Sequence, residues 1–157
     1  MLARTHFVFG VLTGVVLAPF VAKDQPWLFT GLVAFASLLP DVDHIDSTIN
    51  KLFPVTKLFA LLFKHRGFFH SIYPAAIIYG LLWWAGLPFY GLALAIGYVS
   101  HLISDCLTLD GVDLLYPLLR IRVEGFVRTG TMMETLFFVV ITGVLGIVLL
   151  ARYGLLS

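Results

Sequence analysis

Five long apolar stretches constrain this chain more than any other feature of its sequence, and each is bounded by charge, proline or glycine. They cover residues 7–22, 27–39, 71–86, 89–104 and 133–151. Only 12% of the residues are charged, about half of the roughly 25% found in soluble domains, and the mean hydropathy is +0.99. We therefore predict an integral membrane protein, an all-α bundle of about five transmembrane helices in one domain, residues 1–157.

The first four stretches are short for transmembrane helices, because crossing ~30 Å of hydrocarbon takes about 20 residues. Polar clusters lie at their ends, so we expect these helices to end inside the membrane. The first stretch, preceded by Arg4, could also be a secretory signal. If cleavage followed Ala22, Phe20 would occupy the −3 position, where signal peptidase needs a small residue. Four more apolar stretches also follow, so a transmembrane helix is favoured.

Two long connections separate the apolar stretches, at residues 41–70 and 105–132. Residues 52–64 are apolar with interspersed lysines, a pattern typical of a helix lying in the headgroup layer. Residues 118–128 alternate between apolar and polar side chains before Gly125, which predicts a short hairpin-like loop.

Charge and cysteine content exclude other classes. The formal net charge is +1, so nucleic acid is not an expected partner. Cys106 is the single cysteine and can form neither an intramolecular disulfide nor a thiolate metal site.

The histidines and acids fall on one side of the membrane if successive stretches cross it alternately. All five histidines lie on this side, called side A: His6, His44, His65, His70 and His101. Eight of the nine acids lie there too: Asp41, Asp43, Asp46, Asp105, Asp110, Asp113, Glu124 and Glu134. Only Asp24 lies on the other side. This grouping indicates a site.

Imidazole and carboxylate groups are the protein ligands of zinc, iron and manganese. His101 and Asp105 are four residues apart, which places them on one helix face. We predict two or three divalent ions, zinc first and manganese or iron next. The predicted ligands are His6, Asp41, Asp43, His44, His65, His70, His101, Asp105 and Glu134. Asp46 ranks below these.

Each motif alone also has a structural interpretation. His101 and Asp105 could be a hydrogen-bonded pair inside a bundle, the acids after Pro40 a solvated cap, and Arg66 an interfacial anchor. Ser71 beside His70 suggests a helix cap more than a nucleophile. The metal hypothesis depends on their combination.

Four sequence motifs resemble the YdjM family of membrane proteins, which is described as metal-dependent hydrolases. They are Thr5-His6, Pro40-Asp41-Val42-Asp43-His44, His65-Arg66-Gly67-Phe68-Phe69-His70-Ser71 and His101-Leu102-Ile103-Ser104-Asp105. The similarity continues to Glu134. A more distant pattern is similar to the zinc-dependent phospholipase C superfamily, whose members hold three zinc ions and cleave phosphodiesters; this link is an analogy.

We expect a phospholipase-like phosphoesterase acting on a phospholipid or another amphiphilic phosphoester at the cytoplasmic face. Arginines on side A could hold phosphate oxygens: Arg66, Arg120, Arg122 and Arg128. The predicted catalytic residues are Arg66 and a general base, which could be Asp43, Asp105 or Glu134.

The alternative function is metal sensing, storage or transport without turnover. Transport across the membrane is less favoured, because Asp24 is the single candidate ligand on the side opposite side A. Eight basic residues on side A and two on the other side place the N-terminus and the site in the cytoplasm and the C-terminus outside. The expected location is the inner membrane.

Overall fold

The computed structural model describes residues 1–43, 50–51 and 67–152, and this part of the chain is mostly helical. Its elements in chain order are α1 Ala3–Val21, α2 Pro26–Ala36, η1 Leu39–Asp43, η3 Phe68–His70, α5 Ile72–Trp84, α6 Pro88–Cys106, β1 Val112–Asp113, β2 Arg122–Val123 and α7 Met132–Arg152, where η1 and η3 are short 3-10 helices. Proline starts α2 and α6, where its missing N–H costs no helical hydrogen bond.

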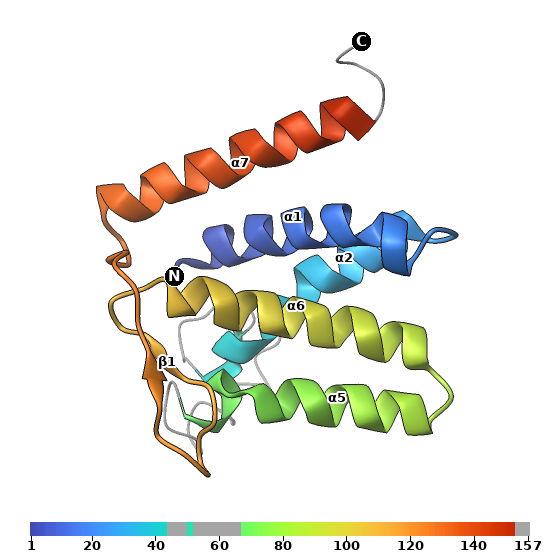
Figure 1. Cartoon of the computed structure of the whole chain (residues 1–157), viewed down its shortest axis with the longest axis horizontal. Helices are drawn as coiled ribbons and strands as arrows, with labels where there is room; N and C mark the ends of the chain where they lie inside the picture. The colour runs from blue at the N-terminus through green and yellow to red at the C-terminus, as the bar shows by residue number, and fades with distance from the viewer. Residues whose placement is uncertain (44–49, 52–66, 153–157) are drawn as a thin grey trace.

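Successive helices of the bundle run in opposite directions (Figure 1). The starts of α1, α5 and α7 and the ends of α2 and α6 therefore meet at one end, which we call the site end. Helix α1 packs on α2, α6 and α7, while α6 also packs on α2 and α5. Helix α7 contacts α1 through the ring pair Phe9–Phe137, with centroids 6.5 Å apart.

Among the described residues, three helices are long and apolar enough to cross a membrane: α1 with 19 residues, α6 with 19 and α7 with 21. The expectation of about five spans is not confirmed, because α2 has 11 residues and α5 has 13. At 1.5 Å per residue, α2 is about 17 Å long. The α-helix ends at Ala36, and the chain continues through Ser37 into η1. The end of the predicted apolar stretch, up to residue 39, is therefore not part of the α-helix.

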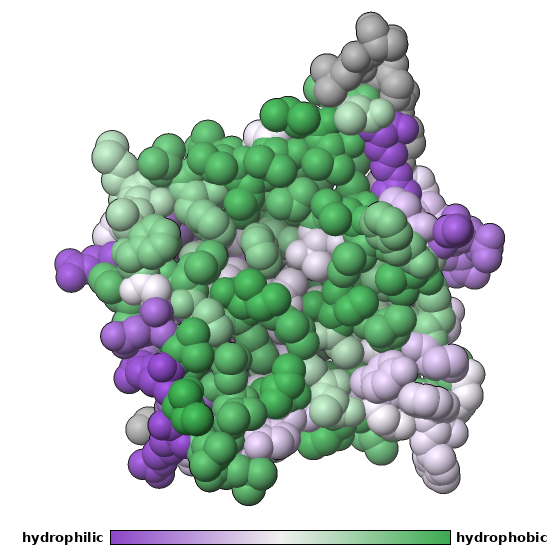
Figure 2. Space-filling view, in the orientation of Figure 1, coloured by the Kyte–Doolittle hydropathy of each residue, from purple (hydrophilic) through white to green (hydrophobic). Residues whose placement is uncertain are grey.

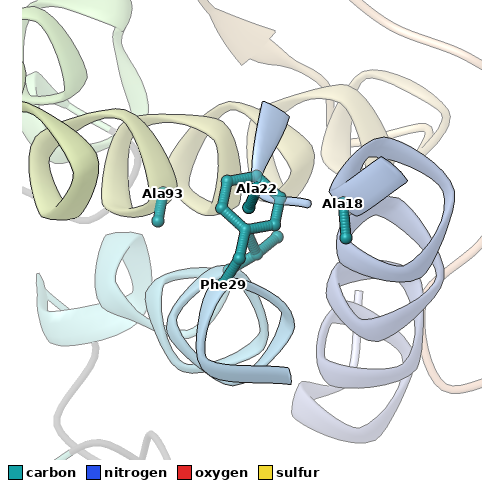
Figure 3. Packing of buried hydrophobic residues seen from close by; sticks show 5 residues of the cluster. Ala18, Ala22, Phe29 and Ala93 are labelled. Carbon is teal, nitrogen blue, oxygen red and sulfur yellow. The ribbon is translucent and has the colours of Figure 1, made fainter. Parts of the chain in front are cut away.

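The core of the bundle joins α1, α2 and α6 through small side chains. Phe29 of α2 is fully buried and packs among Ala18 of α1, Ala22 directly after α1, and Ala93 of α6 (Figure 3). Near the end of α2, a Cβ added to Gly97 at the middle of α6 would collide with the carbonyl oxygen of Val33. Small residues let helix backbones approach closely, and here they hold the end of α2 against α6.

The connection between α6 and α7 folds back onto the end of α6. Strands β1 and β2 are antiparallel, with Val112 opposite Val123. The predicted hairpin is therefore shifted, because residues 114–121 connect its strands and Gly125 does not form its turn. A Cβ at Gly125 would collide with the Leu107 backbone, so this glycine permits a close approach. The predicted interfacial helix, residues 52–64, lies outside the described residues.

Apolar side chains cover the middle of the molecule in Figure 2, and hydrophilic residues gather at its two lateral edges. Large apolar side chains remain exposed along α7, including Leu136, Val139 and Ile147. This distribution is that of a protein whose helix faces contact hydrocarbon.

Candidate metal centre

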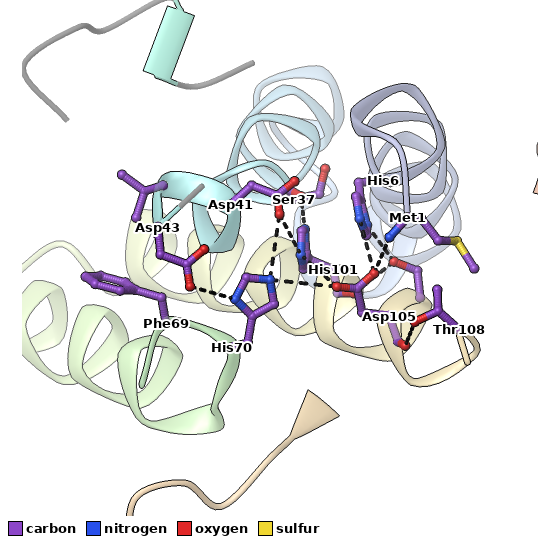
Figure 4. Close-up of polar contacts among 12 residues, drawn as sticks. Met1, His6, Ser37, Asp41, Asp43, Phe69, His70, His101, Asp105 and Thr108 are labelled. Carbon is purple, nitrogen blue, oxygen red and sulfur yellow. Dashed lines mark hydrogen bonds and ion pairs between the residues drawn. The ribbon is translucent and has the colours of Figure 1, made fainter. Parts of the chain in front are cut away.

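Three imidazoles and three carboxylates converge at the site end from four separate elements (Figure 4). They are His6 from α1, Asp41 and Asp43 from η1, His70 from η3, and His101 and Asp105 from α6. The three histidine side chains are fully buried, as is that of Asp43. Asp41 keeps 20% of its side chain exposed. Neutral and anionic side chains of this kind are costly to bury unless something compensates them.

Backbone and hydroxyl groups fix the ring orientation of His101 and His6. Nδ1 of His101 donates to the carbonyl oxygen of Ser37 over 2.8 Å. Nδ1 of His6 lies 2.7 Å from Oγ of Ser104, and that hydroxyl already donates its proton to the carbonyl oxygen of His101. His6 must therefore donate through Nδ1 as well. In the neutral rings, Nε2 of both histidines then carries a lone pair.

These two Nε2 atoms are the observation that most favours a cation. Both are buried and have no hydrogen-bond partner among the described residues. The two rings stack with centroids 3.7 Å apart and planes 14° apart. Nε2 of His6 lies 3.4 Å from Oδ1 of Asp105. Facing lone pairs repel each other unless a proton or a metal ion lies between them.

The other distances have the lengths expected between two ligands of one ion. Oδ2 of Asp105 lies 3.7 Å from Nε2 of His70 and 3.6 Å from Nε2 of His101. Oδ1 of Asp41 lies 3.6 and 3.8 Å from the same two nitrogens. Tetrahedral zinc with bonds near 2.1 Å separates its ligands by about 3.4 Å. These separations exceed those of ordinary hydrogen bonds.

In the part of the chain that the structure describes, two groups of three residues could each hold an ion. Ligand atoms of His6, Asp41 and His101 lie within 4.8 Å of one another, and so do those of His70, His101 and Asp105. His101 belongs to both groups. The donor set is nitrogen and oxygen, which suits zinc, manganese or iron, and the residues present therefore fit a divalent ion.

Asp43 occupies a different position from the one predicted for a ligand. Its Oδ2 lies 3.2 Å from Nδ1 of His70, on the far side of the ring from the cluster. A carboxylate behind a histidine fixes the ring and makes it a stronger ligand. Asp43 thus orients His70, whose Nε2 faces Asp41 and Asp105.

Asp41 and His70 have strongly shifted pKa values. Burial raises the pKa of Asp41, but His101, His70 and His6 together outweigh it and bring the pKa well below its usual range. Burial lowers the pKa of His70, yet the nearby carboxylates of Asp41 and Asp43 outweigh it and raise the pKa to about 9. The cluster without metal thus attracts positive charge at neutral pH.

Glu134 lies apart from the two ligand groups. Its Oε1 accepts hydrogen bonds from the backbone N–H of Leu2 and the hydroxyl of Thr5, and its Oε2 accepts one from the N–H of Gly130. Glu134 is fully buried. These contacts join the start of α7 to the start of α1, beside His6.

Three of the four arginines predicted to bind phosphate, Arg120, Arg122 and Arg128, lie on the exposed connection between α6 and α7. Arg120 lies over the ring of Tyr116, 5.9 Å from its centroid, and Nε of Arg122 donates to the carbonyl oxygen of Asp110 over 3.0 Å. Arg128 is exposed. Within the described part of the chain, the structure does not bring these three side chains into contact with the cluster. His44, Asp46, His65 and Arg66 lie outside the described residues.

Sequence reasoning missed the groups that orient the ligands. Ser37, Ser104 and Tyr98 were not predicted, although Ser104 follows His101 by three residues, within one helical turn. The Tyr98 hydroxyl donates to the carbonyl oxygen of Phe69 and so holds η3 against α6. Asp105 also accepts a hydrogen bond from the Met1 nitrogen.

The model of the YdjM inner membrane protein family matches residues 1–156. The chain belongs to this family. It is 32% identical to protein YvsG of Bacillus subtilis (strain 168) over 140 residues, which are 87% of this chain and 86% of YvsG. It is also 32% identical to inner membrane protein YdjM of Escherichia coli (strain K12) over 130 residues, 74% of this chain and 66% of that protein. No solved structure matches.

Membership in the YdjM family agrees with the three apolar helices long enough to span a bilayer. The chain is therefore a membrane protein. In this YdjM family member, the candidate metal centre lies at the ends of two of those helices, α1 and α6.

Proposed function

We propose that this chain is a metal-dependent hydrolase that acts on a phospholipid or another amphiphilic phosphoester. The observation that carries this proposal is the pair of buried Nε2 atoms of His6 and His101, which lack hydrogen-bond partners among the described residues. Both face carboxylate oxygens at ligand-to-ligand distances. A buried set of this kind, built from four elements, is expensive unless it holds an ion.

The residues of the cluster would have different roles. Zinc, manganese or iron held there would supply a bound water of lowered pKa and would stabilise the negative charge that builds on the phosphate oxygens. Nδ1 donation from His6 and His101 keeps their Nε2 atoms available as ligands. Asp43 orients His70. Asp41 lies at the accessible edge of the cluster, since 20% of its side chain is exposed, so water and substrate would approach from its side.

Glu134 is better suited to positioning than to proton transfer. Three donors already occupy its two oxygens, and hydrogen bonds to the charged form oppose protonation. Phosphate binding by Arg66, Arg120, Arg122 and Arg128 stays a prediction from the sequence.

A second candidate, a structural metal site, is favoured by the full burial of His6, His70 and His101. Structural zinc sites have four protein ligands, whereas catalytic sites keep one position for water. Cobalt(II) added to the metal-depleted protein distinguishes the two. An open site gives a visible spectrum that changes when inorganic phosphate is added, and a closed site gives one that does not change.

The decisive experiment compares His101→Asn with Asp24→Asn in purified protein that is first depleted of metal and then reloaded with zinc. Asparagine can still donate to the Ser37 carbonyl but removes the Nε2 ligand, so His101→Asn should lose zinc and hydrolysis together. Asp24 is exposed at the opposite end of the bundle, and its variant should match the parent in both. Metal content comes from elemental analysis, and turnover from a panel of phosphoesters and phospholipids supplied with each metal. Zinc retention in His101→Asn, or an inert parent protein on the whole panel, would contradict the proposal.

A further inference from the structure

Helices α1 and α6 form a groove of about 340 Å³ that the metal centre does not use. Its walls include Phe9, Thr13 and Leu17 of α1, and Ala95, Val99 and Ile103 of α6. Ligand pockets in proteins span roughly 300–1,000 Å³. The groove is therefore large enough for part of a small molecule.

The two hydroxyl groups that line the groove already donate hydrogen bonds to backbone carbonyl oxygens. The Thr13 hydroxyl donates to the carbonyl oxygen of Phe9 over 2.8 Å. The Ser100 hydroxyl, which also lines the groove, donates to the carbonyl oxygen of Gly97 over 2.7 Å. The remaining lining side chains are apolar. A polar occupant would lose its hydration here without compensation, so the chemistry of the groove selects hydrocarbon.

One end of the groove lies next to the metal ligands. On α1, Phe9, Thr13 and Leu17 follow His6 at spacings of three, seven and eleven residues, which continue one helical stripe. On α6, Ser100 directly precedes His101. From Phe9 to Leu17 the helix rises about 12 Å. The groove thus starts within one turn of the stacked rings of His6 and His101 and runs away from them along the bundle.

Both walls belong to helices long and apolar enough to span a membrane. The molecules that surround such helices are bilayer lipids, whose acyl chains match the groove in polarity. We propose that the groove holds one acyl chain of a bilayer phospholipid while its phosphoester headgroup lies at the cluster of His6, Asp41, His70, His101 and Asp105. This inference rests on the proposed hydrolase function and names its substrate class.

Filling the groove should separate lipid substrates from soluble ones. Ala95→Phe adds a ring inside the groove, and Ala76→Phe adds the same ring on α5, where Ala76 is exposed and does not line it. With a dioleoyl phospholipid in mixed micelles, Ala95→Phe should raise KM at least tenfold, and Ala76→Phe should leave KM unchanged. With a water-soluble short-chain ester of the same headgroup, both variants should match the parent, and both should keep its zinc content.

A binding measurement keeps the inference testable without turnover. A phospholipid with a diazirine in the middle of one chain is photo-crosslinked to the parent protein in vesicles, and mass spectrometry locates the adducts. Adducts should concentrate on the groove segments of α1 and α6, disappear in Ala95→Phe and persist in Ala76→Phe. If Ala95→Phe does not fold, Thr13→Phe on the opposite wall replaces it.

The outcomes separate the two proposals. Localised adducts with no hydrolysis of any substrate would contradict the hydrolase function and leave the lipid groove in place. Hydrolysis by the parent, with unchanged lipid KM in Ala95→Phe and adducts spread over all exposed helix faces, would overturn the groove.

Discussion

Nη1 of Arg152, at the end of α7, donates a hydrogen bond over 2.8 Å to the carbonyl oxygen of Val15 in α1. Pro19 lies four residues after Val15 and has no N–H, so this carbonyl lacks its usual helical donor. Arg152 therefore satisfies a backbone group that the proline leaves open, and in doing so it fastens α7 to α1.

Arg152→Met keeps the aliphatic stem and removes the donor. We expect it to lower the free energy of unfolding in detergent by about 1.5–3 kcal/mol, the value of a hydrogen bond from a charged group. In a Pro19→Ala background, the alanine supplies the missing helical N–H, so Arg152→Met should cost clearly less there. Thermal and denaturant unfolding of the four proteins gives the coupling energy. Equal costs in both backgrounds would show that the Val15 carbonyl does not depend on Arg152.

Asp43→Asn tests the orienting role of Asp43. The amide cannot hold the His70 ring as the carboxylate does, so zinc affinity should fall about 10- to 100-fold. Because Asp43 is not expected to touch the ion, the number of ions per chain at saturating zinc should stay the same. Titration against a competing chelator measures both quantities, with Asp24→Asn as the matched control. A loss of stoichiometry at saturation would make Asp43 a direct ligand.

The raised pKa of His70 predicts proton release on metal binding. With a pKa of about 9, His70 carries a proton at pH 7 in the metal-free protein, and the metal binds only the neutral ring. Zinc affinity should therefore increase with pH up to about 9. Calorimetry at pH 7 in two buffers of different ionisation enthalpy should show release of at least one proton, and His70→Ala should release fewer. Equal heats in the two buffers would refute this prediction.

The same shift predicts how pH affects the metal-free fold. The folded pKa of His70 lies above its ordinary value of 6.5, so its stabilising contribution is complete below about pH 6.5 and disappears as the pH rises through about 9. The free energy of unfolding of the metal-free protein should decline over that window, and the decline should be smaller in His70→Ala. Denaturant titrations at half-unit pH intervals measure it.

Glu134→Ala removes the acceptor shared by Leu2, Thr5 and Gly130. We expect a loss of stability on the order of 2 kcal/mol, because buried N–H groups lose their partner. Zinc stoichiometry should remain that of the parent, since Glu134 lies outside both ligand groups. Elemental analysis of the folded variant at saturating zinc measures this. A missing ion in Glu134→Ala would restore Glu134 to the ligand set predicted from the sequence.

The basic residues on side A predict a cytoplasmic site end and an external C-terminus. Two reporters joined after Ser157 test this. A reporter that is active only outside the cytoplasm should be active, and a reporter that is active only in the cytoplasm should be inactive. The opposite pair of results would reverse the predicted orientation. Reversal would place the metal centre on the external face.

Much of the site could be predicted because helical spacing fixes which residues share a face. The four-residue spacing of His101 and Asp105 and the alternation of apolar stretches brought His6, Asp41 and His70 into one predicted cluster, and the structure places them together. The different positions of Asp41 and Asp43 relative to His70 could not be predicted. Both residues lie in one short 3-10 helix, and the directions of their side chains depend on how η1 packs. The role of Glu134 depends on contacts to Leu2 and Gly130 that no local pattern encodes.

The fold shows a similar division. Hydropathy located α1, α5, α6 and α7 to within a few residues. It could not show that α2 ends at Ala36, because an apolar sequence continues through a change from α-helix to 3-10 helix. Likewise, alternation predicted a strand near Arg122, but its partner, β1, is set by how the connection packs on α6.

The close contact between Gly97 and Val33 has a consequence for ion selection. Helices joined this tightly cannot shift to lengthen the distances between the groups they carry, and Ser37, which orients His101, directly follows α2 at this contact. The nitrogen and oxygen atoms would therefore form a cage of nearly fixed radius. Such a cage would discriminate by ionic size: it would favour ions that form bonds of 2.0–2.2 Å, such as zinc, over calcium, whose bonds of 2.3–2.6 Å need a more flexible set of oxygens.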